Sequence, residues 1–364
     1  MTLGLFLAIG ESFGSLKKQG QDTLVVGQNL KAYSKYFDKV IVFSYAKEKY
    51  HLHKNNELIE NKFHLHRYIY APFLPIINFR KFKECDVLRG LQITGGIPCV
   101  FAKIFFKKPF VVNYGYDYEQ VAKLEGKNVL AFLYAIITFI VVKFADAVII
   151  TSPSLKNKVG KYSPKKIELI PNSVDTKLFS PKNKKRKKIK RIIFVGRLEK
   201  QKNLLSLIEA VSALDYKLKL IFIGDGSQKS ILLKFASRKK VDLEIIKPVP
   251  HDKLPAFLNS CDIFVLPSFI EGHPKVLLEA MSTGLPCIGS SVEGIKEIIS
   301  HNKNGILTST TSEGIKKSIK YLINNHYVAQ RLGKNARKYV TENLDSKKLL
   351  KKEIELLRET ALLS

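Results

Sequence analysis

Two glutamates stand eight positions apart in the stretch EGHPKVLLE, residues 271–279, directly behind the apolar run CDIFVLPSF. The apolar run predicts a buried strand, and Pro274 and Gly284 predict the first turn and the end of a following helix. A helix N-terminus offers N–H donors and partial positive charge, which favour a phosphate. Glu271 and Glu279 are acceptors that favour hydroxyl groups. This turn therefore has the groups that a sugar diphosphate requires.

The predicted helix places its apolar side chains on one arc, at Val276, Leu277, Ala280 and Met281. Glu279 falls outside this arc, so we expect its carboxylate to face a cleft. A second loop, in FVGRLEKQKN, brings Gly196, Arg197 and Lys202 behind another predicted strand, where two cations would neutralise a diphosphate. The loop IGDGSQ, which contains Gly224, also follows a strand.

Short β-branched runs alternate with amphipathic runs along the chain. The expected strands are LGLFLAI, KVIVFSY, PFVVNYG, AVIITS, RIIFVGR, KLIFIGD, LEIIKPV, IFVLPS and PCIGSS. Such alternation predicts parallel sheets covered by helices on both faces, with ligands at the carboxyl ends of the strands. We therefore predict an α/β chain of two Rossmann-like, doubly wound domains. Their expected bounds are 1–175 and 192–340, with a lysine-rich linker at 176–191 and a C-terminal helix at 341–364.

The charge is strongly positive, with 61 Lys and Arg against 32 Asp and Glu in 364 residues, a net charge of +29. Residues 181–191 hold eight of these bases and no acid. An excess of this kind favours anionic partners: nucleic acid, acidic lipid headgroups or phosphorylated substrates. The lysines are dispersed and not clustered with stacking aromatic residues, which argues against specific nucleic-acid binding. The four cysteines form no CxxC pair, which favours buried thiols in a reducing cytoplasm.

Residues 128–150 are almost continuously apolar, but Lys143 and Asp146 interrupt them before the roughly 20 residues that a bilayer span needs. This pattern predicts a helix that ends near Lys143, followed by a buried strand. The helix, centred on 129–142, either belongs to the core or enters a membrane surface with one face. With the basic charge, the second alternative predicts a cytoplasmic protein bound peripherally to the anionic inner face of a membrane. The N-terminal apolar run is short and has no basic leader, so a first strand is expected there.

Four stretches carry a resemblance to a known family: GRLEKQKN, IGDGSQ, CDIFVLPSFIEGHPKVLLEAMSTGLPCIGS and the upstream IPNSVDTKLF. They resemble the retaining GT-B glycosyltransferases of family 4, closely over about residues 147–300. The resemblance implies two Rossmann-like domains that face each other across a cleft. It implies a hexosyl transfer, with retention and without a metal, from a UDP- or GDP-linked sugar. The acceptor would be a lipid-linked or cell-envelope saccharide in polysaccharide biosynthesis. No cofactor is implied, since the nucleotide-sugar is a substrate.

The resemblance also implies roles for the residues of the second domain. Glu271 would contact the donor sugar and Glu279 the ribose hydroxyls, while Arg197 and Lys202 would bind the diphosphate; Glu271, Arg197 and Lys202 are the expected catalytic residues. The expected backbone contacts to donor sugar, phosphate and base come from Gly196, Gly224, Val249, Gly272, His273, Pro274, Lys275 and Val276.

The first domain departs from the family pattern. Only Gly14 and Gly20 can stand for the usual glycine-rich loop after the first strand, and Tyr114, with Asp117 behind it, stands where a histidine is common. DVLRGLQ, with Arg89, replaces a histidine-rich motif. Gly20, Tyr114 and Asp117 are the expected acceptor-side residues. The alternative function is a non-catalytic relative that serves as a partner or scaffold in glycan assembly.

Overall fold

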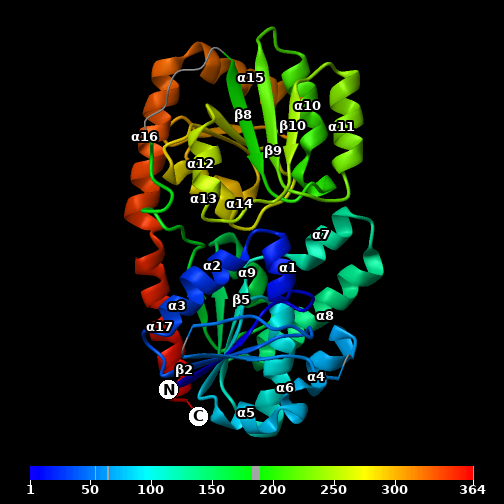
Figure 1. Cartoon of the computed structure of the whole chain (residues 1–364), viewed down its shortest axis with the longest axis vertical. Coiled ribbons are helices and arrows are strands. Elements are labelled where there is room, and N and C mark those ends of the chain that lie inside the picture. Colours follow the sequence, from blue (N-terminus) through cyan, green and yellow to red (C-terminus); the bar gives the residue numbers. More distant parts are fainter. Residues whose placement is uncertain (54, 64, 183–188, 364) are drawn as a thin grey trace. The chain divides into compact units, whose positions relative to one another are not determined.

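The computed structural model describes residues 1–53, 55–63, 65–182 and 189–363. These residues form two compact units (Figure 1). Unit 1 contains residues 1–171 and 349–364, and unit 2 contains residues 172–348. Each unit is built on its own parallel sheet, and each is described separately below.

The sheet of unit 1 has seven strands in the order β3-β2-β1-β4-β5-β6-β7. All of its neighbouring strands pair in parallel, and β1 lies between β2 and β4. The strands are β1 (Thr2–Phe6), β2 (Lys39–Phe43), β3 (Asn56–Ile59), β4 (Val87–Gly90), β5 (Phe110–Tyr114), β6 (Ala147–Ile150) and β7 (Ile167–Leu169). The central strands are buried, which explains their continuous apolar sequences.

Helices cover both faces of this sheet. One face packs through Phe6, Phe43 and Leu88 against α4 (Arg67–Ile77), α5 (Phe79–Glu84), α6 (Ile97–Phe106) and α8 (Asn128–Phe144). The opposite face packs through Leu3 and Leu5 against α1 (Phe13–Lys18), α3 (Lys31–Tyr33) and α17 (Ser346–Ala361). The remaining helices of the unit are α2 (Asp22–Leu24), the π-helix η1 (Val25–Leu30), the 3-10 turn η2 (Ile93–Gly96), α7 (Tyr118–Leu124) and α9 (Ser154–Gly160).

The C-terminal helix α17 belongs to the core of unit 1, where Ile354 and Leu357 are buried. Arg89 of β4 holds it in place, since its Nε donates to Glu353 Oε1 at 2.7 Å and its Nη2 donates to Asn113 Oδ1 at 2.7 Å. The hydroxyl of Tyr33 donates to the same Glu353 oxygen at 2.8 Å. Arg89 is only 1% exposed, so this position, in the stretch that replaces the family's histidine-rich motif, has a structural role here.

The sheet of unit 2 has six parallel strands in the order β10-β9-β8-β11-β12-β13. The strands are β8 (Lys190–Val195), β9 (Leu218–Ile223), β10 (Leu243–Ile246), β11 (Ile263–Leu266), β12 (Cys287–Ser290) and β13 (Ile306–Thr308). Helix α10 (Leu204–Ser212) packs with α11 (Lys229–Arg238) and α15 (Ser312–Asn324), and α13 (Lys275–Ser282) packs with α16 (His326–Asn343). The 3-10 turn η3 (Lys200–Lys202), α12 (Leu254–Asn259) and α14 (Glu293–Lys296) complete the unit.

Each strand expected from the sequence is present, but four strands were not expected: β3, β4, β7 and β13. The unit boundaries fall between residues 171 and 172 and between residues 348 and 349, whereas the sequence suggested a linker at 176–191 and a separate helix from 341. Part of that linker, 183–188, lies outside the described residues. Val174, which the expected bounds place in the first domain, forms a bridge with Asp345 inside unit 2.

Candidate active site

Two loops at the carboxyl edge of the unit 2 sheet are in close contact, and glycines make this contact possible. Gly224 follows β9 with φ +154°, and a methyl group on it would come within 1.9 Å of the Gly196 carbonyl oxygen, behind β8. A methyl group on Gly226 would lie 2.5 Å from the Leu198 oxygen. The backbones of these two loops therefore meet without intervening side chains.

Lys202 and Glu271 form the central charged pair of this edge. Lys202 Nζ lies 2.6 Å from Glu271 Oε1, and Ser268 Oγ donates to the same oxygen at 2.7 Å. The two side chains are only 14% and 8% exposed. Arg197, on the loop after β8, has an exposed side chain. The structure thus brings together Lys202 and Glu271, two of the three predicted catalytic residues, and places Arg197 on the adjoining loop.

The helix that follows Glu271 begins one residue later than the sequence predicted. Helix α13 starts at Lys275 with Pro274 as its N-cap, no side chain caps this end, and Gly284 takes φ +71° behind the last turn. His273 is buried, and its burial lowers the pKa of its imidazole to about 4. Its Nδ1 has no hydrogen-bond partner among the described residues, while its carbonyl oxygen accepts from Asn172 Nδ2 at 2.6 Å. A neutral imidazole and an uncapped helix start therefore lie beside the charged pair.

Glu279 does not project freely into a cleft, as its position on the helix suggested. It is 4% exposed, and its Oε1 lies 2.8 Å from Nε2 of the equally buried His251. The ring of Phe179 lies 5.0 Å from that of His251. The sequence analysis missed His251, although it stands two residues after Val249 in the loop between β10 and α12. Nothing in the local pattern signals a contact that spans 28 residues.

The remaining predicted donor-side positions lie around the same edge. Gly272 is tightly packed, because a methyl group on Gly294 at the start of α14 would come within 1.7 Å of the Gly272 carbonyl oxygen. Val276, in the first turn of α13, and Val249 are both half-buried. Together with the loops described above, these positions line the carboxyl ends of β8, β9, β10 and β11.

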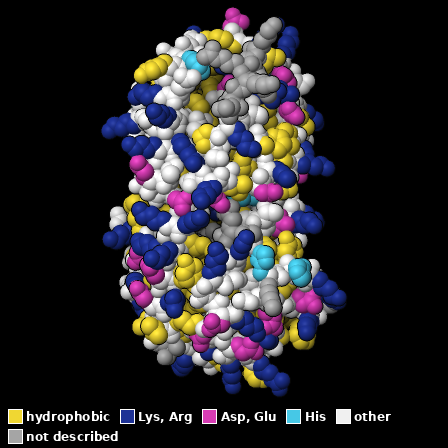
Figure 2. Space-filling model, turned by 60° about the vertical axis from the view of Figure 1, so that its left-hand side comes forward, with side chains coloured by type: hydrophobic (Ala, Val, Ile, Leu, Met, Phe, Trp, Pro, Cys, Tyr) yellow, Lys and Arg dark blue, Asp and Glu magenta, His cyan; other side chains and the backbone are white. Residues whose placement is uncertain are grey.

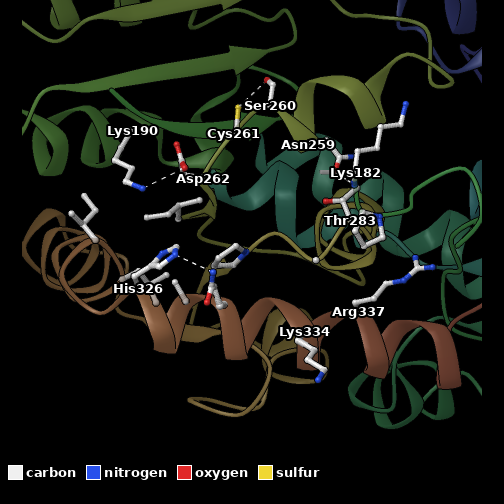
Figure 3. A pocket seen from close by; sticks show the side chains of 18 of the residues that line it. Lys182, Lys190, Asn259, Ser260, Cys261, Asp262, Thr283, His326, Lys334 and Arg337 are labelled. Atoms are coloured by element: carbon white, nitrogen blue, oxygen red, sulfur yellow. Dashed lines mark hydrogen bonds and ion pairs between the residues drawn. The ribbon is translucent and has the colours of Figure 1, made fainter. Parts of the chain in front are cut away.

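A pocket of about 1010 Å³ lies elsewhere in unit 2 (Figure 3). Its lining includes Lys190 at the start of β8 and Asp262 just before β11, so it opens at the amino ends of the strands. None of the predicted donor-side residues lines it. The side chains of Lys182 and Lys334 point in opposite directions there, and Lys190 pairs with Asp262 at 3.6 Å. The predicted donor site is therefore not in this pocket.

The corresponding edge of unit 1 is built differently. Helix α1 has a capping box formed by Ser12 and Ser15. In addition, the Glu48 carboxylate accepts from the Phe13 and Gly14 N–H groups at 3.1 and 2.9 Å. An acidic side chain thus takes the donors that a glycine-rich loop would offer to a phosphate. Gly20, the other glycine considered for such a loop, has φ +69° and follows the end of α1.

The two other acceptor-side candidates also have structural partners. Tyr114 is 3% exposed and belongs to the core of unit 1, and burial together with the neighbouring Asp117 raises the pKa of its phenol. The expectation that Tyr114 offers its hydroxyl to an acceptor therefore does not fit this structure. Asp117 caps α7 by accepting from the Gln120 N–H at 3.0 Å, and it also pairs with Lys158. Within the described part of the chain, no three His, Cys, Asp or Glu side chains gather as metal ligands.

The sequence model of the family described as glycosyl transferases group 1 matches residues 175–339. An uncharacterized glycosyltransferase of Methanocaldococcus jannaschii is 32% identical over 273 residues, which are 69% of this chain and 69% of the relative. A Campylobacter jejuni N-acetylgalactosaminyltransferase that acts on an undecaprenol-diphosphate-linked saccharide is 24% identical over 274 residues, 74% of this chain and 73% of the relative.

Among solved structures, Anabaena HepE in complex with UDP matches with a TM-score of 0.77 at 17% identity, covering 99% of this chain and 100% of that chain. The chain belongs to the group 1 glycosyltransferases and has their GT-B fold of two Rossmann-like units.

Proposed function

We propose that this glycosyltransferase moves a hexosyl unit, with retention of configuration and without a metal, from a UDP- or GDP-linked sugar to a lipid-linked or cell-envelope saccharide. The observation that carries the proposal is the partly buried pair of Lys202 and Glu271 beside the uncapped start of α13. The pair provides a cation for the diphosphate and an acceptor for sugar hydroxyls at one edge. The UDP complex of Anabaena HepE and the lipid-linked acceptor named for the Campylobacter relative support the donor and acceptor classes.

In the proposed reaction, an acceptor hydroxyl oxygen bonds to the anomeric carbon on the face from which the diphosphate departs. The carbon–oxygen bond to the diphosphate breaks, and a departing phosphate oxygen takes the hydroxyl proton. Lys202, Arg197 and the α13 N-terminus stabilise the negative charge that develops on the leaving group. Since the phosphate accepts the proton, the chemistry does not depend on a base at the position of Tyr114.

A thermal-shift panel with UDP, GDP, ADP and their sugars tests the donor site. A ligand present at about a hundred times its dissociation constant stabilises the folded state by roughly 2.7 kcal/mol. We expect one nucleotide to stabilise the wild type and to stabilise Glu279→Ala less, while Glu313→Ala, which removes an exposed carboxylate on α15, responds like the wild type. Folded protein that responds to no nucleotide would instead favour the alternative, a non-catalytic partner or scaffold in glycan assembly.

Two further measurements test the finer claims about the reaction. NMR of the product made from an α-linked donor should show an α-linked sugar, and a β-linked product would contradict retention. Transfer should continue at the same rate when EDTA removes divalent ions. A loss of turnover in EDTA that Mg²⁺ or Mn²⁺ restores would contradict the metal-independent reaction.

We also propose that unit 1 rests on an anionic lipid surface. Exposed apolar side chains follow α8 at helical spacing, at Val129, Phe132, Leu133, Ile136, Phe139 and Ile140. The neighbouring helices α4 and α6 add Ile69, Phe73, Ile76, Ile104 and Phe105. We call these side chains the apolar face. No helix in the described ranges is long and apolar enough to cross a bilayer, so the proposed contact is with the surface.

The charge of the chain complements such a surface. The net charge is +29, and Lys and Arg side chains are scattered over the side of the molecule shown in Figure 2. Each base near an anionic leaflet contributes about 1 kcal/mol. We expect the protein to float with vesicles that contain phosphatidylglycerol more than with neutral vesicles, and Phe132→Ser with Phe139→Ser to reduce this flotation. Equal flotation of the wild type and a soluble control protein would contradict the proposal.

A further inference from the structure

Four tyrosines gather at one end of unit 1, and the proposed function leaves them without a role. Tyr116 follows β5, Tyr118 begins α7, Tyr134 lies on α8 and Tyr68 lies in the first turn of α4. The ring centroids of Tyr116 and Tyr118 are 4.8 Å apart, and those of Tyr118 and Tyr134 are 5.2 Å apart. Tyr68 and Tyr116 both lie close enough to Tyr134 to affect the pKa of its phenol. We call these residues the tyrosine cluster.

The tyrosine cluster lies where a parallel sheet binds ligands. Tyr118 lies close enough to Thr94 of η2, which follows β4, and to Glu11, which follows β1, for both to affect the pKa of its phenol. Tyr118 therefore reaches the carboxyl ends of β1, β4 and β5, the edge at which α/β sheets hold their substrates. Tyr116 and Tyr134 are half-buried and Tyr68 is exposed, so ring surface remains accessible.

A guanidinium lies beside the ring of Tyr68. The Cζ of Arg67 lies 5.5 Å from the ring centroid of Tyr68. A methyl group built on Gly10, in the loop after β1, would come within 3.4 Å of the same Cζ. Arg67 is exposed and stands at the junction of the β1 loop with α4. Guanidinium groups bind phosphate through two parallel hydrogen bonds, so this position suits a phosphate group.

The apolar face borders Arg67 on α4 and surrounds Tyr134 on α8. Helix α4 continues from Arg67 and Tyr68 to the exposed Ile69 and Phe73. On α8, Tyr134 stands directly after the exposed Leu133. On α4 the cation and the aromatic ring are therefore followed by apolar side chains, whereas on α8 the ring of Tyr134 lies between apolar side chains on both sides.

We infer that Arg67 and the tyrosine cluster bind the acceptor, and that the acceptor is a saccharide joined through phosphate to a hydrocarbon chain. The sugar stacks on the tyrosine rings, Arg67 pairs with the phosphate, and the chain lies toward the apolar face. This inference rests on the proposed function for the identity of the reaction, but the binding that it describes involves unit 1 alone. Tyr116 and Arg67 act here as specificity-determining residues.

A set of four probes tests the three parts of the inferred site. The full probe is N-acetylglucosamine joined through a diphosphate to an undecyl chain, and the other three lack the sugar, the diphosphate or the chain. The chain contains no tryptophan, so Tyr134→Trp introduces a single fluorescent reporter. We expect the full probe to shift its emission to shorter wavelength at a concentration at least about tenfold below that needed by each truncated probe. Tyr327→Trp, an exposed site in unit 2, should show no shift.

Two substitutions in the reporter variant separate the sugar from the phosphate. Arg67→Ala should weaken the full probe about tenfold and leave the diphosphate-free probe unchanged, while Arg80→Ala should have no effect. Arg80 is the matched control because its Cζ lies 5.7 Å from the Phe79 ring in a similar contact on α5. Tyr116→Leu should weaken the sugar-containing probes about three- to tenfold and leave the sugar-free probe unchanged.

The inference is overturned if the sugar-free probe binds as tightly as the full probe, or if Arg67→Ala weakens all four probes equally. Circular dichroism on each variant shows whether it has folded, and Tyr116→Phe, which keeps the ring, should restore binding. The nucleotide panel on the same preparations separates this result from the proposed function. Probe binding without any nucleotide response would support the acceptor site and refute the donor site. A nucleotide response without probe binding would support the donor site and refute the acceptor site.

Discussion

Two helices that begin at the carboxyl edges of the two sheets differ in whether side chains cap their first turn. In unit 2, α13 begins behind Pro274 with no side-chain cap, beside the paired Lys202 and Glu271. In unit 1, α1 carries a capping box, and the Glu48 carboxylate accepts from two N–H groups of its first turn. The same architecture therefore leaves one helix start without a side-chain cap and satisfies the other. The side chain that reaches the first turn determines whether the N–H groups of that turn already have an acceptor.

Among the changes that test this difference between the two units, removal of the Lys202 cation beside α13 should have the largest effect. We expect Lys202→Ala to lower the transfer rate about 100- to 1000-fold, because a preorganised charge that faces the leaving diphosphate is lost. Lys200→Ala, an exposed change in the same turn, is the control and should retain nearly full activity. Steady-state kinetics with both variants measure the difference. Equal transfer rates for the two variants would show that Lys202 does not take part in the reaction.

The buried imidazole in front of α13 makes unit 2 sensitive to acid. The pKa of His273 is lowered to about 4 by burial, from an ordinary value of 6.5. Between these two values the unfolded chain binds a proton that the folded chain does not. Stability is therefore complete above pH 6.5 and declines as the pH falls towards 4, by at most about 3 kcal/mol.

Urea unfolding at a series of pH values, for the wild type and His273→Leu, tests this dependence. The variant cannot titrate, so its stability should change less over this pH range. His53→Leu, which alters an exposed histidine, should keep the slope of the wild type. Identical slopes for the wild type and His273→Leu would show that His273 does not carry the effect.

The contact between His251 and Glu279 should have a smaller effect on nucleotide binding. His251→Ala leaves the buried Glu279 carboxylate without its partner, which we expect to cost about 1–3 kcal/mol of stability. The dissociation constant for the responding nucleotide should rise about tenfold, because Glu279 is no longer held in one orientation. His251→Gln, which keeps an N–H donor, should restore part of both losses. Unchanged binding in His251→Ala would mean that His251 serves stability alone.

The sequence predicts only part of the fold and of the candidate site, for a physical reason. Strands such as β8 and β9 and the turn at Pro274 are encoded locally, by β-branched runs and by the backbone limits of proline. The short strands β3 and β7 lack a buried apolar run, so no local signal marks them. The Lys202–Glu271 site could be predicted because parallel strands bring their carboxyl ends to one edge. Pairs such as His251 with Glu279, and Glu48 with α1, arise from the path of loops that no sequence period encodes.

The smallest predicted effect concerns Glu48 itself. Glu48→Ala removes an acceptor from the first turn of α1, and the loss of a helix cap typically costs about 1 kcal/mol. Because Glu48 lies in unit 1, the nucleotide response of unit 2 should stay unchanged. Glu60→Ala, in the segment after β3, is the control and should leave stability unchanged. A new affinity of Glu48→Ala for inorganic phosphate would show that the capping box alone does not prevent anion binding at α1. Glu48 would then be the residue that distinguishes the two helix starts.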